Sequence, residues 1–369
     1  MAGVRSTWAA MPRRSRFAAA IVPLAVVVAA TGTILAVGLG SGPAPGEPTP
    51  PPPVAAASTP PPLPPEPSLE PSPSPDPTPT PAPAGADPLL GTDGRLTVLL
   101  LGSDYRPAHP GNRTDAIMVV SVDPVSGKAA GFSIPRDTVN FPLAGGGVYQ
   151  PKVNGLYAYL QSRGNNGGVA MSRAVAAAFK VEVDGYAFIG FAGVKGLVAA
   201  VGGVDVTLDK PYYDAEYWVN AHHRGWGLPA GRSHLGPNDA LIFARSRKGD
   251  NDFGRARRQQ LLVLGALDRV RGRGVTRLPQ LLKAANDVVR TNLPLDRAAD
   301  LFAVVSRTDI SKVDRIVFGP RSYASGVGGT SFQLNLKACR AWIAANFPPA
   351  RPMGQWPPVT AAPGASAAP

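Results

Sequence analysis

The densest positive charge in this sequence lies in residues 244–260, ARSRKGDNDFGRARRQQ. This segment has six basic residues and two aspartates, so its local net charge is +4. The basic residues are Arg245, Arg247, Lys248, Arg255, Arg257 and Arg258, and the aspartates are Asp250 and Asp252. Guanidinium groups keep their charge and repel one another, so such crowding is favoured where a multiply charged anion is bound. The planar guanidinium suits phosphate best. A solvated basic helix face is the alternative, but the Arg-Ser-Arg alternation and the Gln259-Gln260 pair before an apolar run favour a binding site.

A second group of charged residues follows an apolar run, in the sequence LLLGSDYRPAHPGNRTD at residues 99–115. It contains Asp104, Arg106, Arg113 and Asp115. Ends of strands are where α/β folds place ligand-binding groups. Two carboxylates beside two arginines are consistent with a site for Mg²⁺, which binds through one or two carboxylates plus substrate phosphates. Two Asp–Arg salt bridges that close the loop are the other explanation.

Two weaker motifs carry similar residue types. The run Ser133-Ile134-Pro135-Arg136-Asp137 again places an Arg-Asp pair after an expected strand, and Lys152 and Asn154 precede two tyrosines. The four histidines lack metal-ligand spacing, and the glycines at 145–147 lack the Lys and Ser/Thr of a P-loop. No Ser/His/Asp order stands out, so we expect electrostatic rather than nucleophilic chemistry.

Strands that alternate with helices are expected to position these residues. The hydrophobic pattern predicts strands at 96–101, 117–122, 129–134, 186–191, 204–208 and 313–318. It predicts helices at 168–179, 192–201, 255–270, 278–289, 295–305 and 334–345. This alternation is typical of an α/β domain, and we expect three α/β/α layers around a central mixed sheet.

Composition indicates an anionic partner and an exported domain. The net charge is +12, and the only cysteine, Cys339, excludes an internal disulfide and is expected to be buried. Residues 17–39 lack charge, are long enough to cross a bilayer, and follow a basic segment at 1–16. By the positive-inside rule, the N-terminus is cytoplasmic and the rest lies outside a single-pass cell-membrane anchor. A cleaved signal peptide is the alternative.

The remaining chain divides by composition. Residues 40–89 form an expected disordered linker, since 21 of the 42 prolines lie between 43 and 88. A folded domain is expected at 90–347, followed by a disordered Pro/Ala-rich tail at 348–369. Export disfavours a nucleic-acid partner, and no helix-turn-helix pattern is recognisable.

Taken together, several motifs resemble the LytR-CpsA-Psr family of cell-wall glycopolymer transferases. They are GSDYR, NRTD, SIPRD, KVNGLYAY, AVGGVDVTLD and ALIFARSRKGDNDFGRARRQQ, in the family's order within residues 96–271. The resemblance implies a membrane-anchored phosphotransferase that moves a glycopolymer from a polyprenyl-pyrophosphate carrier to peptidoglycan and releases polyprenyl phosphate. A pyrophosphatase acting on the same carriers and a non-catalytic binder of anionic wall polymer are the alternatives.

The resemblance also implies roles for particular residues. Asp104 and Asp115 match aspartates linked to Mg²⁺, with Mn²⁺ as a possible substitute. Arginines that hold the pyrophosphate match Arg113, Arg136, Arg245, Arg247 and Arg255, with Gln259 and Lys152 beside them. Arg106 and Arg258 fit motif positions of the substrate site. Either Asp115 or Asp104 is a candidate base for the acceptor hydroxyl. For the lipid tail, Leu156, Phe188, Phe191 and Leu197 are candidates, although core packing is the favoured role of each residue taken singly.

Overall fold

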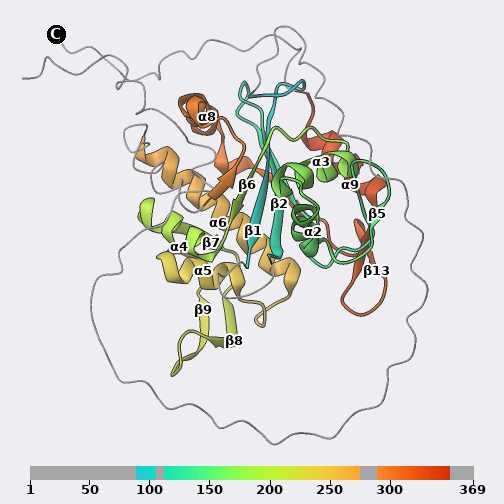
Figure 1. The fold of residues 1–369 in the computed structure, drawn as a ribbon. Coiled ribbons are helices and arrows are strands. Elements are labelled where there is room, and N and C mark those ends of the chain that lie inside the picture. Colours follow the sequence, from blue (N-terminus) through green and yellow to red (C-terminus); the bar gives the residue numbers. More distant parts are fainter. Residues whose placement is uncertain (1–88, 105–111, 275–288, 350–369) are drawn as a thin grey trace, which may run out of the picture. The chain divides into compact units, whose positions relative to one another are not determined.

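A six-stranded mixed sheet organises the part of the chain that the computed structural model describes, residues 89–104, 112–274 and 289–349 (Figure 1). Its strands are β1 (Leu96–Ser103), β2 (Thr114–Val122), β3 (Ala129–Ser133), β6 (Gly185–Ile189), β11 (Val289–Thr291) and β12 (Asp314–Val317). Their order is β11-β6-β1-β2-β3-β12. The β1–β6 and β3–β12 pairs are parallel, whereas the other three pairs are antiparallel. The predicted central mixed sheet is confirmed.

The sheet separates two hydrophobic cores. Because successive side chains of a strand point to opposite faces, the apolar run of β1 serves both cores. Leu96, Val98 and Leu100 belong to one core, and Leu99 and Leu101 belong to the other. A strand buried on both faces requires helices on both faces.

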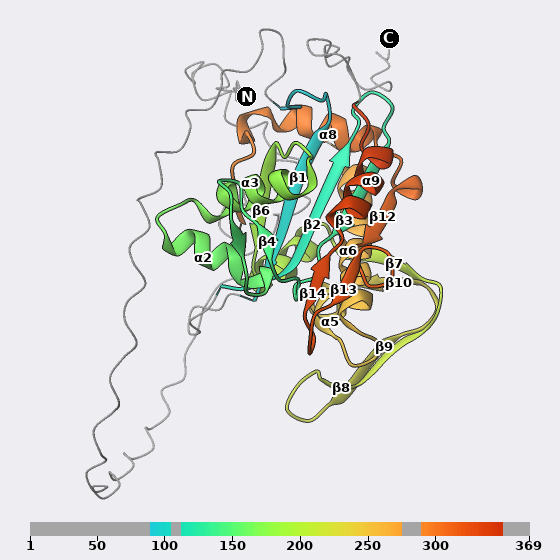
Figure 2. The same cartoon turned by 90° about the vertical axis from the view of Figure 1, so that its right-hand side faces the viewer.

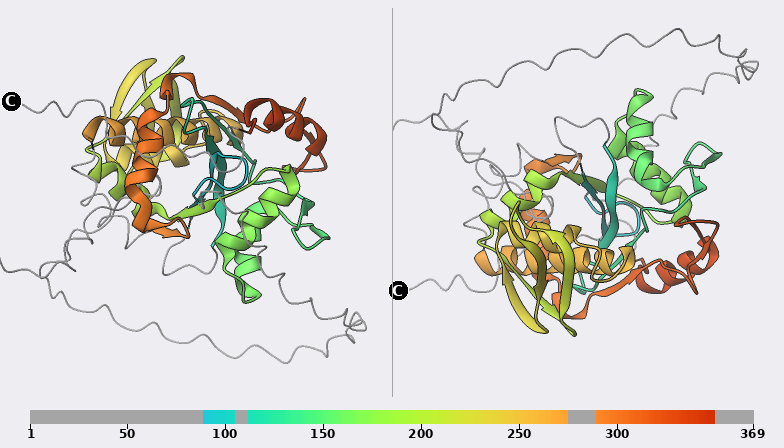
Figure 3. Two further views of the ribbon diagram at one scale, coloured as in Figure 1. Left: turned by 90° about the horizontal axis from the view of Figure 1, so that it is seen from above. Right: turned by 90° about the horizontal axis from the view of Figure 1, so that it is seen from below.

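Helices cover the sheet on its two sides (Figures 2 and 3). On one side lie α4 (Phe191–Ala200), α5 (Pro237–Arg245), α6 (Asp252–Arg273) and α8 (Ala298–Arg307), and on the other lie α2 (Leu156–Ser162), α3 (Gly167–Phe179) and α9 (Leu336–Asn346). Cys339 of α9 is buried, as predicted.

Four two-stranded sheets and three 3₁₀ turns lie outside the central sheet in the described residues. The two-stranded sheets are β4 (Phe141–Pro142) with β5 (Val148–Tyr149), β7 (Val204–Leu208) with β10 (Gly231–Leu235), β8 (Tyr212–Trp218) with β9 (Arg224–Leu228), and β13 (Ala324–Gly326) with β14 (Phe332–Leu334). Three 3₁₀ turns complete the description: η2 (Val153–Gly155), η4 (Leu295–Arg297) and η5 (Ile310–Lys312). The β8–β9 hairpin projects beyond α5, at the same end of the sheet as the carboxyl end of β1 (Figure 1).

Several expected elements differ from the structure or lie outside its described residues. The strand expected at 186–191 ends at Ile189, and Phe191 already begins α4. The helix expected at 278–289 lies outside the described residues, apart from Val289, which begins β11. The expected anchor, linker and most of the tail also lie outside them. Among the described residues, no helix is both long enough and apolar enough to span a membrane.

Close packing of α3 on β6 generates a prediction about stability. A Cβ added at Gly168 would lie 2.2 Å from Cε2 of the buried Tyr186 ring. Because the ring cannot move away without disturbing the core, Gly168→Ala is expected to lower the free energy of unfolding by about 1–3 kcal/mol. Gly145→Ala is the control, since nothing lies within 4 Å of its Cβ position. Denaturant unfolding measures both, and equal stability of the two variants would contradict the packing described.

Candidate functional site

A cavity of about 330 Å³ opens where β1 ends and β2 begins. Its polar end is formed by Asp104, Asp115, Arg136, Arg245, Arg247, Arg255 and Gln259. Its apolar end lies between the sheet and helices α4, α5 and α6, and is lined by residues such as Leu100, Met118, Phe191, Leu197, Leu241 and Leu262. The cavity therefore joins a cluster of charges to the hydrophobic core.

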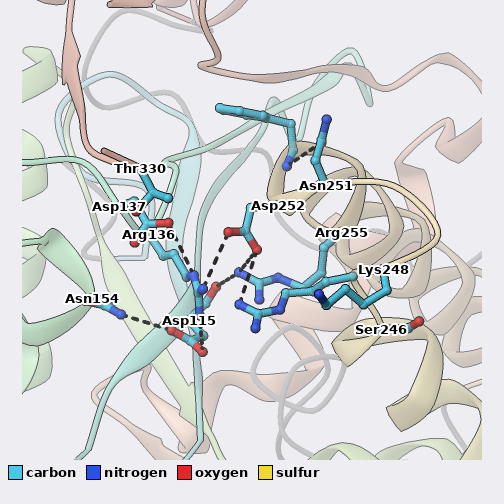
Figure 4. Close-up of polar contacts among 12 residues, drawn as sticks. Asp115, Arg136, Asp137, Asn154, Ser246, Lys248, Asn251, Asp252, Arg255 and Thr330 are labelled. Carbon is cyan, nitrogen blue, oxygen red and sulfur yellow. Dashed lines mark hydrogen bonds and ion pairs between the residues drawn. The ribbon is translucent and has the colours of Figure 1, made fainter. Parts of the chain in front are cut away.

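Asp115 is held from two sides. It is the second residue of β2, which begins at Thr114 rather than at the predicted position 117. Nη1 of Arg136, which follows β3, donates to one carboxylate oxygen at 3.0 Å. Nδ2 of Asn154 donates to the other at 3.1 Å (Figure 4). Residues from three separate segments thus fix one carboxylate at the edge of the sheet.

Asp252 is the site residue that sequence reasoning missed. It lies between two arginines (Figure 4), 3.2 Å from Nη2 of Arg255 and 3.5 Å from Nη2 of Arg136. Nη1 of Arg247 lies 3.7 Å away. The preceding residue could have indicated its position, because an asparagine is a typical helix N-cap. The side chain of Asn251 caps α6 by accepting hydrogen bonds from the backbone amides of residues 253 and 254. An aspartate in the first turn of a helix is also favoured by the helix dipole.

The arginines of the polar end differ in their electrostatic surroundings. Burial lowers the pKa of Arg136, but the carboxylates of Asp115, Asp252 and Asp137 outweigh this effect and raise the pKa above its usual value. Arg255 is only 5% exposed, and burial lowers its pKa despite the neighbouring Asp252. Both guanidinium groups remain charged at neutral pH because the unperturbed pKa is so high.

Several buried polar atoms in this cluster have no hydrogen bond within the described protein. They are Nε of Arg136 and Nε of Arg255, whereas Oδ1 of Asp252 lacks a hydrogen bond but is ion-paired with Arg255 and Arg247. Leaving such an atom unsatisfied costs about 1–3 kcal/mol. The guanidinium groups of both arginines line the cavity, and such groups are suited to an anionic ligand that supplies acceptor oxygens.

Two further predicted residues line the cavity from α5 and α6. The guanidinium of Arg245 lies 4.3 Å from the centre of the Phe191 ring and donates to the hydroxyl of Tyr217 at 3.5 Å. Nε2 of Gln259 donates to the carbonyl of Ala244 at 3.1 Å. The structure therefore brings both ends of the 244–260 segment to one cavity.

Other predicted site residues do not line the cavity. Lys152 pairs with Asp137 at 2.7 Å and donates to the hydroxyl of Thr330. Arg258 is buried, pairs with Asp250 and donates to the carbonyl of Phe243. Arg113 is exposed, and its backbone amide donates to the carboxylate of Asp104 at 3.1 Å. Arg106 lies outside the described residues.

The apolar candidates divide between the two faces of the sheet. Phe191 and Leu197 line the cavity, as a lipid-binding role requires. Leu156 and Phe188 instead belong to the core on the opposite face, where Phe188 stacks on Tyr157. Their role is core packing, because the sheet separates them from the cavity.

The donor set at the polar end fits a hard divalent ion. Asp104 directly follows β1, Asp115 lies in the neighbouring strand β2, and both line the same cavity. Carboxylate oxygens are ligands that Mg²⁺ accepts. No group of three or more His, Cys, Asp or Glu side chains is placed to hold a metal in the part of the chain that the structure describes. A divalent ion would therefore take two carboxylates and complete its coordination with water or ligand oxygens.

The fold and the site define an α/β domain with a cavity at the sheet edge that has arginines at one end and apolar side chains at the other. Comparison with known families then shows the family. The LytR_cpsA_psr family model matches residues 78–338, and the chain belongs to that family.

The relatives have related names and structures. The chain is 35% identical over 210 residues to the polyisoprenyl-teichoic acid–peptidoglycan teichoic acid transferase TagU of Bacillus cereus, covering 56% of this chain and 63% of TagU. It is 29% identical over 226 residues to TagV of Bacillus subtilis, covering 60% of this chain and 55% of TagV. The chain thus spans less than two thirds of either relative.

Solved structures share the fold. The crystal structure of Bacillus subtilis TagV matches with a TM-score of 0.55 and 25% identity, over 69% of this chain and 97% of that one. A structure of TagT bound to LIIa-WTA matches with a TM-score of 0.54 and 23% identity, over 70% and 92% of the two chains.

The position of Asp252 among three arginines generates a second prediction. Asp252→Asn removes the carboxylate they share, so their repulsion is expected to lower the free energy of unfolding by about 1–3 kcal/mol. The more positive cavity should then be stabilised more strongly by inorganic pyrophosphate than the wild-type cavity is. Thermal unfolding with and without pyrophosphate, in the presence of a chelator, measures both effects.

Asp268→Asn, an exposed change on the same helix, is the control for lost negative charge. The shared-carboxylate arrangement is contradicted if Asp252→Asn and Asp268→Asn unfold at the same temperature and respond equally to pyrophosphate.

Proposed function

We propose that this chain is a phosphotransferase that moves a glycopolymer from a polyprenyl-pyrophosphate carrier to peptidoglycan. The observation that carries the proposal is a single cavity with arginines at one end and apolar side chains at the other. A polyprenyl pyrophosphate has the same division between a charged group and a hydrocarbon tail. The names of the related TagU and TagV proteins support this substrate class.

Binding would use the two ends of the cavity differently. At the polar end, guanidinium groups of Arg136, Arg247 and Arg255 would donate charge-assisted hydrogen bonds to the pyrophosphate. At the apolar end, near Phe191 and Leu197, each buried methylene of the lipid would contribute about 0.8 kcal/mol. The charged end thus orients the carrier, and the apolar end adds affinity.

Transfer would be a substitution at the phosphorus next to the glycan. An acceptor hydroxyl of peptidoglycan forms the new P–O bond, the bond to the bridging oxygen breaks, and polyprenyl phosphate leaves with the electron pair. The hydroxyl proton passes to a carboxylate at the sheet edge, either Asp115 or Asp104. The arginines offset the charge that develops on the leaving phosphate, which is the main task of a protein in phosphoryl transfer.

Mg²⁺ is part of this proposal. When bound by Asp104 and Asp115, it would neutralise charge on the pyrophosphate. The proposal also places the domain outside the cell, anchored through residues 17–39, because that uncharged segment follows arginines at positions 5, 13, 14 and 16.

A matched pair of arginine variants tests the proposed chemistry. The full-length chain is incubated with Mg²⁺, a polyprenyl-pyrophosphate oligosaccharide and peptidoglycan. Arg247→Ala removes a donor from the cavity and is expected to slow transfer about a hundred- to thousand-fold. Arg257→Ala removes an equal charge from the exposed face of α6 and should leave the rate within about two-fold of wild type.

The products distinguish the alternative functions. Glycan linked to peptidoglycan supports the transferase, whereas free glycan phosphate alone indicates a pyrophosphatase. Absence of both products, with retained salt-sensitive binding of anionic polymer, indicates a binding protein and contradicts both enzymatic functions. Equal rates for Arg247→Ala and wild type would show that the cavity is not the reaction site.

Metal removal gives a further prediction. Chelation of divalent ions is expected to abolish transfer, and added Mg²⁺ should restore it because the two carboxylates then regain their ion. Asp115→Ala should remove this dependence together with the activity, while circular dichroism shows the fold retained. Full activity of the chelated wild-type chain would exclude the proposed role of the metal.

A further inference from the structure

Arg245 and Arg247 are two residues apart, and this spacing would not let both side chains reach one cavity from a continuous helix. Arg245 and Arg247 both line the cavity. In a continuing α-helix, residues two apart point about 200° away from each other. Here α5 ends at Arg245, and Ser246 has extended backbone angles, φ −57° and ψ 141°. The end of the helix at this residue therefore allows both side chains to reach one cavity.

Ending the helix leaves backbone carbonyls without their usual partners. In a continuing helix, Phe243 and Ala244 would accept from the amides four residues later. Instead, the carbonyl of Phe243 accepts Nε of Arg258 at 3.1 Å, and that of Ala244 accepts Nε2 of Gln259 at 3.1 Å. Two side chains of α6 thus replace the missing helical donors.

The backbone amides that no longer take part in helical hydrogen bonds donate to one carboxylate of β8. Oδ2 of Asp214 accepts the backbone amides of Arg247 and Lys248 at 3.1 and 3.0 Å. The same oxygen accepts the hydroxyl of Ser246 at 2.5 Å. The three donors are consecutive residues of the segment that follows α5, so one carboxylate sets the path of that segment.

Asp214 is only 1% exposed, and no ion pair within the described residues neutralises it. Oδ1 accepts the backbone amide of Glu216 at 3.0 Å, so both oxygens are occupied. Burial raises the pKa of Asp214, but the hydrogen bonds from Ser246 and the three amides outweigh it and hold the pKa below its usual range. A buried carboxylate is costly without such donors, which ties the 246–248 segment to β8.

We propose that Asp214 is a positioning residue that ends helix α5 after Arg245 and thereby directs Arg245 and Arg247 into the same cavity. It acts through these arginines and does not line the cavity itself. It lies on the β8–β9 hairpin, between the motifs AVGGVDVTLD and ALIFARSRKGDNDFGRARRQQ and outside both. The hairpin therefore has a role in the proposed function, on which this inference rests.

Asp214→Asn in the full-length chain tests the proposal, because an amide keeps the size but cannot accept at both oxygen positions. Asp209→Asn is the matched control, an exposed aspartate just before β8. Hydrogen exchange is expected to accelerate at least ten-fold at the amides of Arg247 and Lys248 in Asp214→Asn. Exchange in β1 and β2 should stay unchanged, and Asp209→Asn should match wild type.

The affinity for geranylgeranyl pyrophosphate, measured by calorimetry, distinguishes a positioning role of Asp214 from a purely structural one. Asp214→Asn is expected to weaken binding about ten-fold in the wild-type background, and less than two-fold when Arg245 and Arg247 are both alanine. An equal loss in both backgrounds would overturn the proposal, as would unchanged exchange at residues 247 and 248.

Failure of Asp214→Asn to fold and failure of the wild-type chain to bind the ligand are each followed by a further measurement. If Asp214→Asn does not fold, Ser246→Ala removes a single donor, and the same local exchange and coupled binding loss are expected from it on a smaller scale. If the wild-type chain binds no geranylgeranyl pyrophosphate, the proposed function fails, whereas the exchange measurement still decides whether Asp214 holds the end of α5.

Discussion

Repulsion among guanidinium groups is the constraint on which this site depends. Four arginines line one cavity, and two of them are substantially buried. The carboxylates of Asp115 and Asp252 lie between them and offset part of this charge. The balance remains positive, because four arginines face the carboxylates of Asp104, Asp115 and Asp252. The protein thus keeps the arginines together without fully neutralising them, which leaves them ready for an anion.

The sheet explains why the charged groups and the apolar space adjoin. Asp104 follows β1, Asp115 begins β2, and Arg136 follows β3, so antiparallel neighbours bring all three to one edge. The core between this sheet and helices α4 to α6 reaches the same edge and contributes the apolar lining. An amphiphilic ligand would therefore meet both parts of its binding site without a second domain.

The sequence predicted β1, β2, β3, β6 and β12 because apolar residues recur in each, but it did not predict the short edge strand β11. It predicted charged site residues because several of them follow the apolar runs directly. It did not predict α5, whose mixed pattern between Pro237 and Arg245 gives a weak helical signal. Nor did it identify Asp252 or Asp214. The Asn251 cap marks Asp252 only as a first-turn residue of α6. The functional importance of both aspartates depends on contacts with distant segments, such as Arg136 with Asp252, which no local pattern encodes. Phe188 has the core-packing role expected for it, and only the structure decides which core an apolar side chain on a strand faces.

The most direct test of the account is the affinity of the chain for a series of pyrophosphates that differ only in prenyl length. If one cavity holds both the charged group and the tail, affinity should rise steeply from inorganic pyrophosphate to geranyl and farnesyl pyrophosphate, by about 0.8 kcal/mol per buried methylene at most. It should then level off once the cavity is filled. Inorganic pyrophosphate binding as tightly as the longest member would contradict the central claim that the arginines and the apolar cavity form a single site.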